Sequence, residues 1–431
     1  MRVTVAGLWH LGSVTAACLA STGCTVVGVD ADGSIVERLA AGDPPVAEPG
    51  LADLLSSTMR DGALTFTRDL AASVAVSDVV WVCYDTPVDE DDRADVDAVI
   101  GHVTSTFPFL RADTVVLVSS QLPVGSIRRL EEAWLRLADG RRVSFACSPE
   151  NLRLGRAIDA FLRPDRIVVG TRDDWARSRI AELFAPITDR IEWMSVESAE
   201  MTKHAINGFL ATSVTFINEV AALCEAVGAD AKEVERGLKT EHRIGPRAYL
   251  APGGAIAGGT LARDVMFLRE IGDSAKRPTP LLDGLVASNI AHREWARRRL
   301  VDEIGSLDGA TVAVWGLTYK PGTDTLRRSE AVALCRWLLG QRAHVRVHDP
   351  MVASLPDELG AVERFQDPID AAAGAAALVV ATEWPVYQQV PPDALARTMP
   401  RGLVLDANRF LAKTVGRDPR FRLVAVGQPH L

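Results

Sequence analysis

The stretch "VTVAGLWHLGSVTAACLASTGCTVVGVD", residues 3–30, decides the fold, because it contains the patterns of a strand, a turn, a helix and a second strand. "RVTVAGL" and "TVVGVDAD" are short apolar runs typical of buried strands, and "HLGSVTAACLASTG" has apolar residues at helical spacing. Gly7 and Gly12 occupy the first and last positions of a GxGxxG turn, but Trp9 replaces the middle glycine. The pattern predicts a βαβ unit that binds a dinucleotide, and we assign Leu11 in the same turn to the cofactor contacts.

Asp30 supports a dinucleotide site in spite of Trp9. The second strand ends at Asp30, about 20 residues after the turn, where a carboxylate can accept hydrogen bonds from a ribose diol. The same carboxylate disfavours the 2′-phosphate of NADP, so we expect the cofactor to be NAD. The alternative is a βαβ turn with a purely structural role.

The remainder of the chain continues the alternation of strands and helices. Further apolar runs occur in "DVVWVCY", "DTVVLVSS", "RRVSFACSP" and "DRIVVG", and a long helical pattern then extends from about Glu197 to Val227. From residue 309 onward, "GATVAVWGLTYKPGTDTLRRS" starts the plan again, and "AALVVATEW" and "GLVLDANRF" follow. We predict an α/β fold with two Rossmann-like, doubly wound parallel-sheet domains, joined by a long helix and a helical middle domain.

Composition narrows the class of protein. The 431 residues are 48% hydrophobic and 24% charged, with a net charge of −9 and no basic cluster, so we expect no nucleic-acid partner. We also expect no membrane span and no signal peptide, and therefore a cytoplasmic protein. Six cysteines without a CxxC pair indicate buried thiols rather than disulfides or a metal site: Cys18, Cys24, Cys83, Cys147, Cys224 and Cys335.

Three further segments are ambiguous when each is taken alone. In "EMTKHAIN", Lys203 and Asn207 are four residues apart and share a helix face, although a solvated lysine beside a surface amide is the ordinary interpretation. In "SPENLRLG", Glu150 is either a functional group or a loop carboxylate. In "APGGAIAGGTLARDVMFL", residues 251–268, the glycines indicate close approach to the main chain, and Asp264 is either functional or a charge favoured near a helix start.

Taken together and in order, these segments resemble the UDP-glucose/GDP-mannose dehydrogenase family over nearly the whole chain. The matching segments include "GLWHLGSVTA", "EPGLADLL", "SSQLPVGS", "SPENLRLGRAIDAFLRPDRIVVG", "EMTKHAINGFLATSVTFINEVAALCEAVGAD", "HRIG", "GGAIAGGTLARD", "GLTYKPGTDTLRRS", "ATEW" and "DANRF". The resemblance implies an NAD-binding domain over 1–198, a helical linker and dimerisation domain over 199–300, and a nucleotide-sugar-binding α/β domain over 301–431. It also implies oxidation of a sugar C6 alcohol to a carboxylate with two NAD, through a thioester on a cysteine of the glycine-rich motif.

The resemblance also implies roles for individual residues. Lys203 and Asn207 match groups that hold the sugar oxygen, Asp264 matches an acid/base or water-positioning residue, and Glu150 matches a glutamate of the active site. Arg243 matches an arginine that reaches the sugar of a neighbouring subunit in a homodimer. The other positions assigned from the resemblance are Gln121 and Arg327 for the cofactor and Leu152, Gly258 and Lys320 for the substrate. Thr86, also assigned to the cofactor, and Glu48 are weaker matches.

The departures from the family pattern concern the covalent half of the reaction. Thr260 occupies the cysteine position, Arg263 replaces a lysine, and Leu154 replaces a second glutamate. Ala255 and Ala257 replace glycines, and Gln121 replaces a threonine. A threonine hydroxyl needs an activating base to become a nucleophile, and no histidine flanks Thr260.

The sequence therefore favours a single two-electron oxidation that stops at a carbonyl. A ketone from a secondary alcohol explains the lost cysteine better than an aldehyde, because a ketone has no hydrogen left for a second oxidation. One hypothesis for the substrate is a GDP-octose intermediate of a lincosamide-type antibiotic pathway. Two alternatives remain: four-electron oxidation of an NDP-hexose such as UDP-glucose through an aldehyde hydrate, and a catalytically silent nucleotide-sugar binder.

Overall fold

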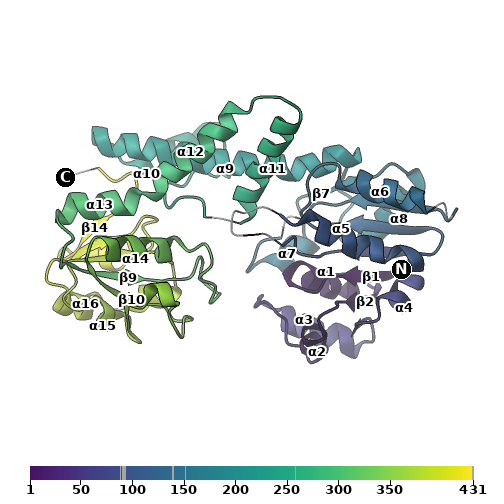
Figure 1. The fold of residues 1–431 in the computed structure, drawn as a ribbon, viewed down its shortest axis with the longest axis horizontal. Helices are drawn as coiled ribbons and strands as arrows, with labels where there is room; N and C mark the ends of the chain where they lie inside the picture. Colours follow the sequence, from purple (N-terminus) through teal and green to yellow (C-terminus); the bar gives the residue numbers. More distant parts are fainter. Residues whose placement is uncertain (88, 90–93, 138–139, 151, 258, 430–431) are drawn as a thin grey trace. The chain divides into compact units, whose positions relative to one another are not determined.

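The computed structural model describes residues 1–87, 89, 94–137, 140–150, 152–257 and 259–429. The chain forms two compact units, Met1–Ile206 and Asn207–Leu431. Figure 1 colours the first from purple to blue and the second from teal to yellow, and each contains one sheet. The expected domain boundaries near residues 198 and 300 stay a prediction.

The first unit has a sheet of eight described strands in the order β3-β2-β1-β4-β5-β6-β7-β8. The strands are β1 (Arg2–Ala6), β2 (Thr25–Val29), β3 (Leu64–Thr67), β4 (Val79–Val82), β5 (Thr114–Val118), β6 (Val143–Cys147), β7 (Ile167–Gly170) and β8 (Ile191–Met194). All neighbouring pairs are parallel except β6 and β7, where Cys147 lies opposite Gly170. The order reverses between β1 and β4, so the switch point that commonly binds ligands lies at the carboxyl ends of these two strands.

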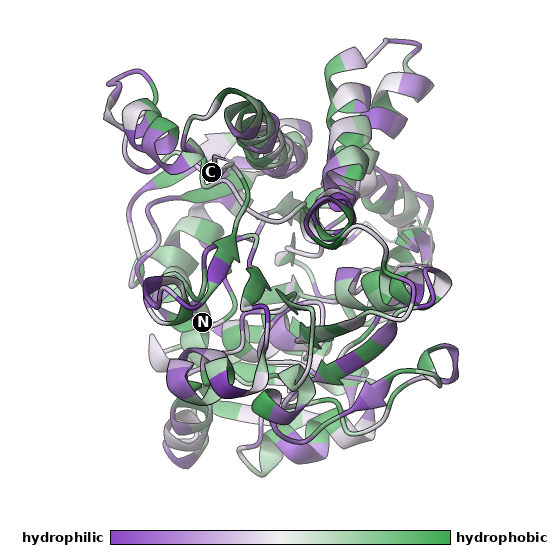
Figure 2. Cartoon of the chain, turned by 90° about the vertical axis from the view of Figure 1, so that its left-hand side faces the viewer, coloured by the Kyte–Doolittle hydropathy of each residue, from purple (hydrophilic) through white to green (hydrophobic). Residues whose placement is uncertain are grey.

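Helices cover both faces of this sheet, which explains why its central strands β4 and β5 are buried along their whole length. Every residue of β4 and β5 is buried, as expected for parallel strands between two helical layers. Figure 2 shows the same tendency for the chain as a whole, because strands carry mostly the hydrophobic colour and helices at the surface carry more of the hydrophilic colour. The helices are α1 (His10–Ser21), α2 (Gly33–Ala40), α3 (Leu51–Arg60), α4 (Leu70–Ala75), α5 (Val96–Ser105), α6 (Ser126–Arg136), α7 (Ala157–Leu162) and α8 (Asp174–Phe184).

The second unit has a parallel sheet of six described strands in the order β11-β10-β9-β12-β13-β14. Its strands are β9 (Thr311–Trp315), β10 (His344–His348), β11 (Glu363–Arg364), β12 (Ala377–Val380), β13 (Leu403–Leu405) and β14 (Arg422–Val424). Its helices are α10 (Ala231–Thr240), α11 (Thr260–Ser274), α12 (Pro280–Arg293), α13 (Trp295–Ile304), α14 (Glu330–Gly340), α15 (Pro368–Ala372) and α16 (Pro392–Thr398). The predicted class, two Rossmann-like parallel sheets with a helical middle region, is confirmed.

The two sheets carry the same turn after their central strands. Gly7 and Gly316 both have φ +89°, in the left-handed region where a side chain is strained. A Cβ on Gly7 would lie 2.7 Å from the backbone nitrogen of Tyr84, and one on Gly316 would lie 2.6 Å from that of Thr382. The repeated sequence plan therefore has a structural counterpart in two equivalent, closely packed glycine turns.

The long helix α9 (Val196–Val227) begins in the first unit and ends in the second. Among the described helices it is also the one that is long and apolar enough to cross a bilayer, with a mean hydropathy of 1.4 in its most apolar window. Core helices pass the same test, so this is weak evidence for a span, and 39% of that window is buried within the protein. All six cysteines are buried free thiols, as the sequence predicts.

Candidate active site

The turn after β1 is shaped by its two glycines and by Asp30. A Cβ on Gly12 would lie 1.7 Å from the carbonyl oxygen of Gly7, so only glycine permits α1 to start this close to the strand. The backbone N–H of Leu8 donates to Asp30 Oδ2 at 2.7 Å. This bond holds the turn against the end of β2, while Asp30 remains partly exposed.

The start of α1 fits a dinucleotide in spite of Trp9. Trp9 is the N-cap residue and is 44% exposed, and no side chain caps the helix start. The first turn of α1 also has no acidic residue. Its N–H groups and the helix dipole therefore favour an anionic pyrophosphate, and Asp30 can accept from a ribose diol.

The equivalent turn of the second unit does not offer the same carboxylate. One oxygen of Asp349 accepts from Leu317 N at 2.7 Å, from Thr318 N at 3.1 Å and from the Trp384 indole at 3.1 Å. Asp349 is buried, whereas Asp30 is partly exposed. The dinucleotide geometry is thus a property of the first unit.

Two loops at the carboxyl ends of β4 and β5 are joined through Thr86. Its buried hydroxyl donates to the carbonyl oxygen of Gln121 at 2.6 Å. Gln121 lines a small cavity of about 20 Å³ together with Glu150 and Lys203. A neighbouring cavity of about 80 Å³ is lined by Leu11, Leu152 and Glu150, among others. These sequence-predicted residues of the first unit therefore lie close together at the carboxyl ends of its strands.

Lys203 and Glu150 form an ion pair beside these cavities. Lys203 Nζ donates to the carbonyl oxygen of Glu150 at 2.6 Å and to its carboxylate at 3.3 Å. The other carboxylate oxygen of Glu150 accepts from Leu152 N at 2.7 Å. Lys203 is buried, so its positive charge is screened weakly and can act on a nearby oxygen.

Two neighbours of Lys203 on α9 hold the loop that contains Gln121. The Glu200 carboxylate accepts from Gly125 N at 2.7 Å and from Ile127 N at 2.9 Å, at the start of α6. His204 Nε2 lies 3.1 Å from the carbonyl oxygen of Leu122. Burial raises the pKa of Glu200, although both backbone hydrogen bonds oppose the shift. These contacts fix the loop against the helix that carries Lys203.

Glu48 is a buried acceptor beside the dinucleotide turn. Its carboxylate accepts from Gly155 N and from Ala157 N, each at 2.9 Å, and lies 3.0 Å from His10 Nε2. Burial alone would raise the pKa of Glu48, but the donors at Ala157, His10 and Gly155 together lower it. Glu48 therefore ties the start of α1 to the start of α7.

In the second unit, Asn207 and Asp264 form a close buried pair. The Asn207 amide donates to the Asp264 carboxylate, and Asp264 is fully buried on α11. Thr260 is four residues earlier on the same helix, at its first position, and is exposed. Gly258 lies outside the described residues.

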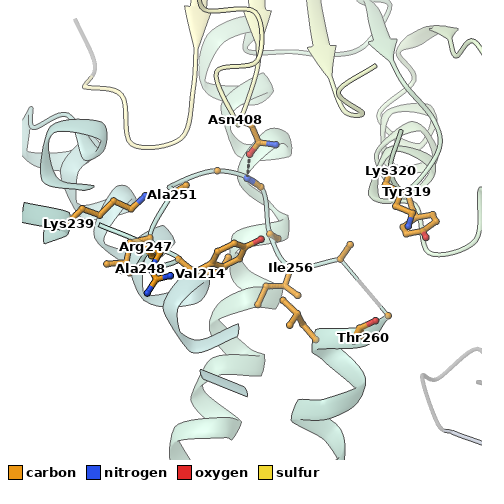
Figure 3. Close-up of a pocket in the computed structure, with 18 of the residues that line it drawn as sticks. Val214, Lys239, Arg247, Ala248, Ala251, Ile256, Thr260, Tyr319, Lys320 and Asn408 are labelled. Carbon is orange, nitrogen blue, oxygen red and sulfur yellow. Dashed lines mark hydrogen bonds between the residues drawn. The ribbon is translucent and has the colours of Figure 1, made fainter. Parts of the chain in front are cut away.

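Thr260 lines a cavity of about 730 Å³. The glycine-rich loop runs along this cavity, and Lys320 lies 5.2 Å from the ring centroid of Tyr319 at its rim. In the view of Figure 3, Lys239 and Arg247 lie at one side, and Lys320 and Thr260 lie at the other. The described lining residues include these three cations and no carboxylate, which suits an anionic ligand.

Side chains from several elements hold the main chain of the glycine-rich loop. Asn218 on α9 bonds Gly253 N at 3.0 Å and the carbonyl oxygen of Gly254 at 3.2 Å. His292 on α12 lies 2.8 Å from the carbonyl oxygen of Gly253, and Asn408 accepts from Gly254 N at 2.7 Å. These hydrogen bonds hold in place the main chain of the loop that lines the cavity.

Two predicted arginines lie away from the described lining of this cavity. The Arg243 side chain is 86% exposed and pairs with Glu241 at 2.8 Å in the turn after α10. Arg327 is exposed in the segment before α14. Any role of either residue in the site stays a prediction.

Comparison with known proteins identifies the family. Residues 1–188 match the NAD binding domain of the UDP-glucose/GDP-mannose dehydrogenase family, residues 197–291 match its central domain, and residues 313–413 match its UDP binding domain. A UDP-glucose 6-dehydrogenase of Pseudomonas aeruginosa is 35% identical, over 100% of this chain and 98% of that protein. The chain belongs to the UDP-glucose/GDP-mannose dehydrogenase family.

Solved structures agree with this membership. A UDP-glucose dehydrogenase from Pyrobaculum islandicum is 31% identical with a TM-score of 0.86, and 96% of each chain is covered. A UDP-D-ManNAc dehydrogenase from Pyrococcus horikoshii is 25% identical with a TM-score of 0.85, and 99% of each chain is covered. This member of the dehydrogenase family is accordingly an NAD-dependent oxidoreductase that acts on nucleotide sugars.

Sequence reasoning missed the residues that hold the glycine-rich loop. Asn218 and Asn408 lie in the matched segments "FINEVA" and "DANRF", but nothing in their spacing connects them to residues 253–254. His292 lies in no matched segment. Their common feature, a polar side chain that bonds a main-chain atom distant in sequence, exists only after the chain has folded.

Proposed function

We propose that this dehydrogenase performs one two-electron oxidation of a C6 carbinol on a nucleotide-activated sugar and releases a carbonyl product. The carbinol carbon loses a hydride to NAD, the hydroxyl loses a proton, and a C=O bond forms. A secondary alcohol would give a ketone, and a GDP-octose of a lincosamide-type antibiotic pathway would supply such an alcohol. The balance is one NADH and one proton for each sugar oxidised.

Thr260 carries this proposal. It occupies the position where the family pattern has a nucleophilic cysteine, on the wall of the anion-compatible cavity. The carboxylate one turn later, Asp264, is already engaged by Asn207. A hydroxyl is a weak nucleophile without an activating base, so a covalent intermediate on Thr260 is disfavoured.

No thiol of the chain is available to replace the missing cysteine. All six cysteines lie among the described residues and are buried. Burial raises the pKa of every one of these thiols, to about 12 for Cys18 and Cys335. A protonated, enclosed thiol cannot attack a carbonyl, which supports a reaction without a thioester.

The remaining groups suffice for a hydride transfer. When bound at the turn of Gly7 and Asp30, NAD supplies the hydride acceptor. We expect Lys203 and Asn207 to stabilise negative charge as it develops on the sugar oxygen, and Asp264, which accepts from the Asn207 amide, to orient that amide or take a proton. We expect Lys203→Ala to lower kcat about 100-fold or more with little change in NAD affinity.

NADH stoichiometry tests the proposal. The protein is incubated with NAD and a panel of UDP-, GDP- and dTDP-sugars that includes octoses, and products are identified by mass spectrometry. One NADH per sugar and loss of two hydrogens would support the proposal, whereas two NADH and an acid would contradict it. The Thr260→Cys variant then distinguishes an aldehyde product from a ketone product. If the product is an aldehyde, the variant should form closer to two NADH per sugar, whereas a ketone product should leave the ratio at one.

A second candidate is four-electron oxidation of UDP-glucose to the uronic acid, with water in place of the thiol. It is favoured by the full-length relatives, which include UDP-glucose 6-dehydrogenases of Pseudomonas aeruginosa and Rhizobium meliloti. The same stoichiometry measurement decides between the two. A silent nucleotide-sugar binder, suggested by Trp9, would be favoured if NAD failed to bind at millimolar concentration.

The active form is proposed to be a homodimer in which Arg243 reaches the site of the partner. The high exposure of Arg243 in its own chain is compatible with such a role. We expect Arg243→Ala to raise the sugar KM about tenfold or more, because a lost charged hydrogen bond costs roughly 1.5–3 kcal/mol. An unchanged KM would argue against a shared site.

A further inference from the structure

The Asn408 side chain links three parts of the second unit. Its Oδ1 accepts from Gly254 N at 2.7 Å, and Figure 3 marks this bond at the edge of the cavity. Its amide also bonds to the carboxylate of Glu383, after β12. The carboxylate accepts only, so it must face the Asn408 NH₂ group, and this orientation directs Oδ1 toward the loop.

Asn408 is itself held at a fixed place. It lies in the turn after β13, where the buried carboxylate of Asp406 accepts from Leu411 N at 2.7 Å and from the backbone N–H of Asn408. The next residue, Arg409, pairs with Asp230 at 2.7 Å, at the start of α10. The amide is therefore carried by a rigid turn rather than by a free loop.

A side chain at residue 253 would collide with Asn408. A Cβ on Gly253 would lie 2.1 Å from Asn408 Oδ1 and 3.2 Å from its Cγ, and the next nearest heavy atom is Asn408 Cα at 3.8 Å. Gly253 does not have a positive φ, so the backbone itself would accept alanine. The Asn408 amide would therefore have to move to admit a side chain at residue 253.

Asn408 lines two cavities. Gly254, Ala255 and Asn408 line both the 730 Å³ cavity and a second cavity of about 130 Å³ on the side of β12 and β13. This short piece of main chain and the amide that bonds to it therefore border both cavities. A shift of Asn408 would change the shape of the larger cavity directly.

From these contacts we infer that Asn408 is a positioning residue for the substrate: oriented by Glu383, it fixes Gly253 and Gly254 as the wall against which the nucleotide of the sugar binds. The inference rests on the proposed nucleotide-sugar function. Asn408 acts through the loop, so its replacement should change substrate affinity and leave the cofactor turn of the first unit unchanged.

The first test is a double-mutant cycle of Gly253→Ala and Asn408→Ala, with UDP and NAD as the probes in titration calorimetry. We expect Gly253→Ala to weaken UDP binding about tenfold, because the new Cβ displaces the amide. Asn408→Ala should weaken it by a similar factor through the lost bond to Gly254. The double variant should bind UDP no more weakly than Asn408→Ala alone, and all three should bind NAD as the wild type does.

The second test inverts the hydrogen bond between Glu383 and Asn408. Asn408→Asp keeps an acceptor for Gly254 N but sets a carboxylate against Glu383, so UDP affinity should fall. Adding Glu383→Gln restores a donor and acceptor pair in the reverse sense, and affinity should return to within about threefold of the wild type. A direct contact between Asn408 and the nucleotide would not be rescued in this way.

The outcomes are distinguishable from failure of the proposed function. UDP affinity that is unchanged in Asn408→Ala, or additive losses in the double variant, would overturn the inference. If the wild type bound none of UDP, GDP and dTDP, the nucleotide-sugar function and the inference that rests on it would both fail. Thermal unfolding of the same cycle would still report whether Asn408 and Gly253 collide. Gly254→Ala, whose Cβ would lie 3.8 Å from Oδ1, is the stability control and should unfold like the wild type.

Discussion

At the scale of single residues, buried polar side chains hold the main chain in place through hydrogen bonds to its N–H and C=O groups. Glu48 ties α1 to α7, Glu200 caps α6 from α9, and Asn218 holds the glycine-rich loop. Each bonds main-chain groups in a loop or at the start of a helix, where regular secondary structure leaves backbone groups without partners. A buried N–H without a partner costs about 1–3 kcal/mol, so these side chains determine whether the turns around the site keep their shape.

Glu48→Gln tests this role. The amide keeps the size of the side chain but presents one acceptor where the carboxylate presents two, so a backbone N–H at residue 155 or 157 loses its partner. We expect the free energy of unfolding to fall by about 2 kcal/mol, measured by urea denaturation. Glu37→Gln, at an exposed position of α2, is the matched control and should change stability by less than about 0.5 kcal/mol.

His292 predicts a pH dependence of stability. Burial lowers its pKa below the ordinary value of 6.5, while it donates to the carbonyl oxygen of Gly253. The unfolded chain therefore binds the proton more readily, so this contribution to stability is complete above about pH 6.5 and is lost as the pH falls below that value. In His292→Gln the donor remains but the titration disappears. The loss of stability on acidification from pH 7 toward pH 5 should become shallower, and an unchanged slope would contradict the assignment.

At the scale of elements, α9 carries an apolar stripe that the described chain leaves open. Phe209, Phe216 and Leu223 recur every seven residues, and Phe209 and Leu223 are 71% and 66% exposed. A seven-residue repeat keeps side chains on one side of a helix, as in helices that pack against a partner. This stripe supports the proposed homodimer and gives it a defined surface.

Leu223→Glu should disrupt that dimer. Burying a carboxylate from each copy in an apolar interface costs several kcal/mol, so the dissociation constant should rise about 100-fold or more. Light scattering after size-exclusion chromatography measures the mass. Leu135→Glu on α6 is the control, because it makes the same substitution at a leucine that is 74% exposed in the first unit. A variant at 223 that kept the mass of the wild type would place the interface elsewhere.

At the scale of the whole molecule, the two similar sheets differ in the ligand that each is suited to bind. Gly7 and Gly316 have the same φ, but Asp349 is buried and accepts from the Trp384 indole, whereas Asp30 is partly exposed. A dinucleotide needs the open carboxylate, so NAD belongs to the first unit. The proposed nucleotide-sugar wall belongs to the second unit.

Ligand-dependent stability tests this division. Asp30→Asn keeps an acceptor for Leu8 N but binds a ribose diol less well than a carboxylate. NAD at 100 times its dissociation constant should stabilise the wild type by about 2.7 kcal/mol, seen as a rise in Tm, and should stabilise Asp30→Asn much less at the same concentration. The rise in Tm caused by UDP should be the same in both proteins. Loss of both effects would show that the variant damages more than the cofactor turn.

The sequence by itself determined the architecture, the NAD turn and the family, because each depends on local patterns. Strand and helix periods, the glycine spacing and the carboxylate at Asp30 lie within short windows, where sterics and hydrogen bonding act directly. The replacement of a cysteine by Thr260 is inferred from the same kind of window and stays a prediction. The tertiary structure decided that all six thiols are enclosed, that the Trp384 indole donates to Asp349, and that Asn408 holds the loop at Gly253 and Gly254. The last two depend on contacts between residues 35 and 154 positions apart, and burial of the thiols depends on packing of the whole chain. Only folding brings such groups together.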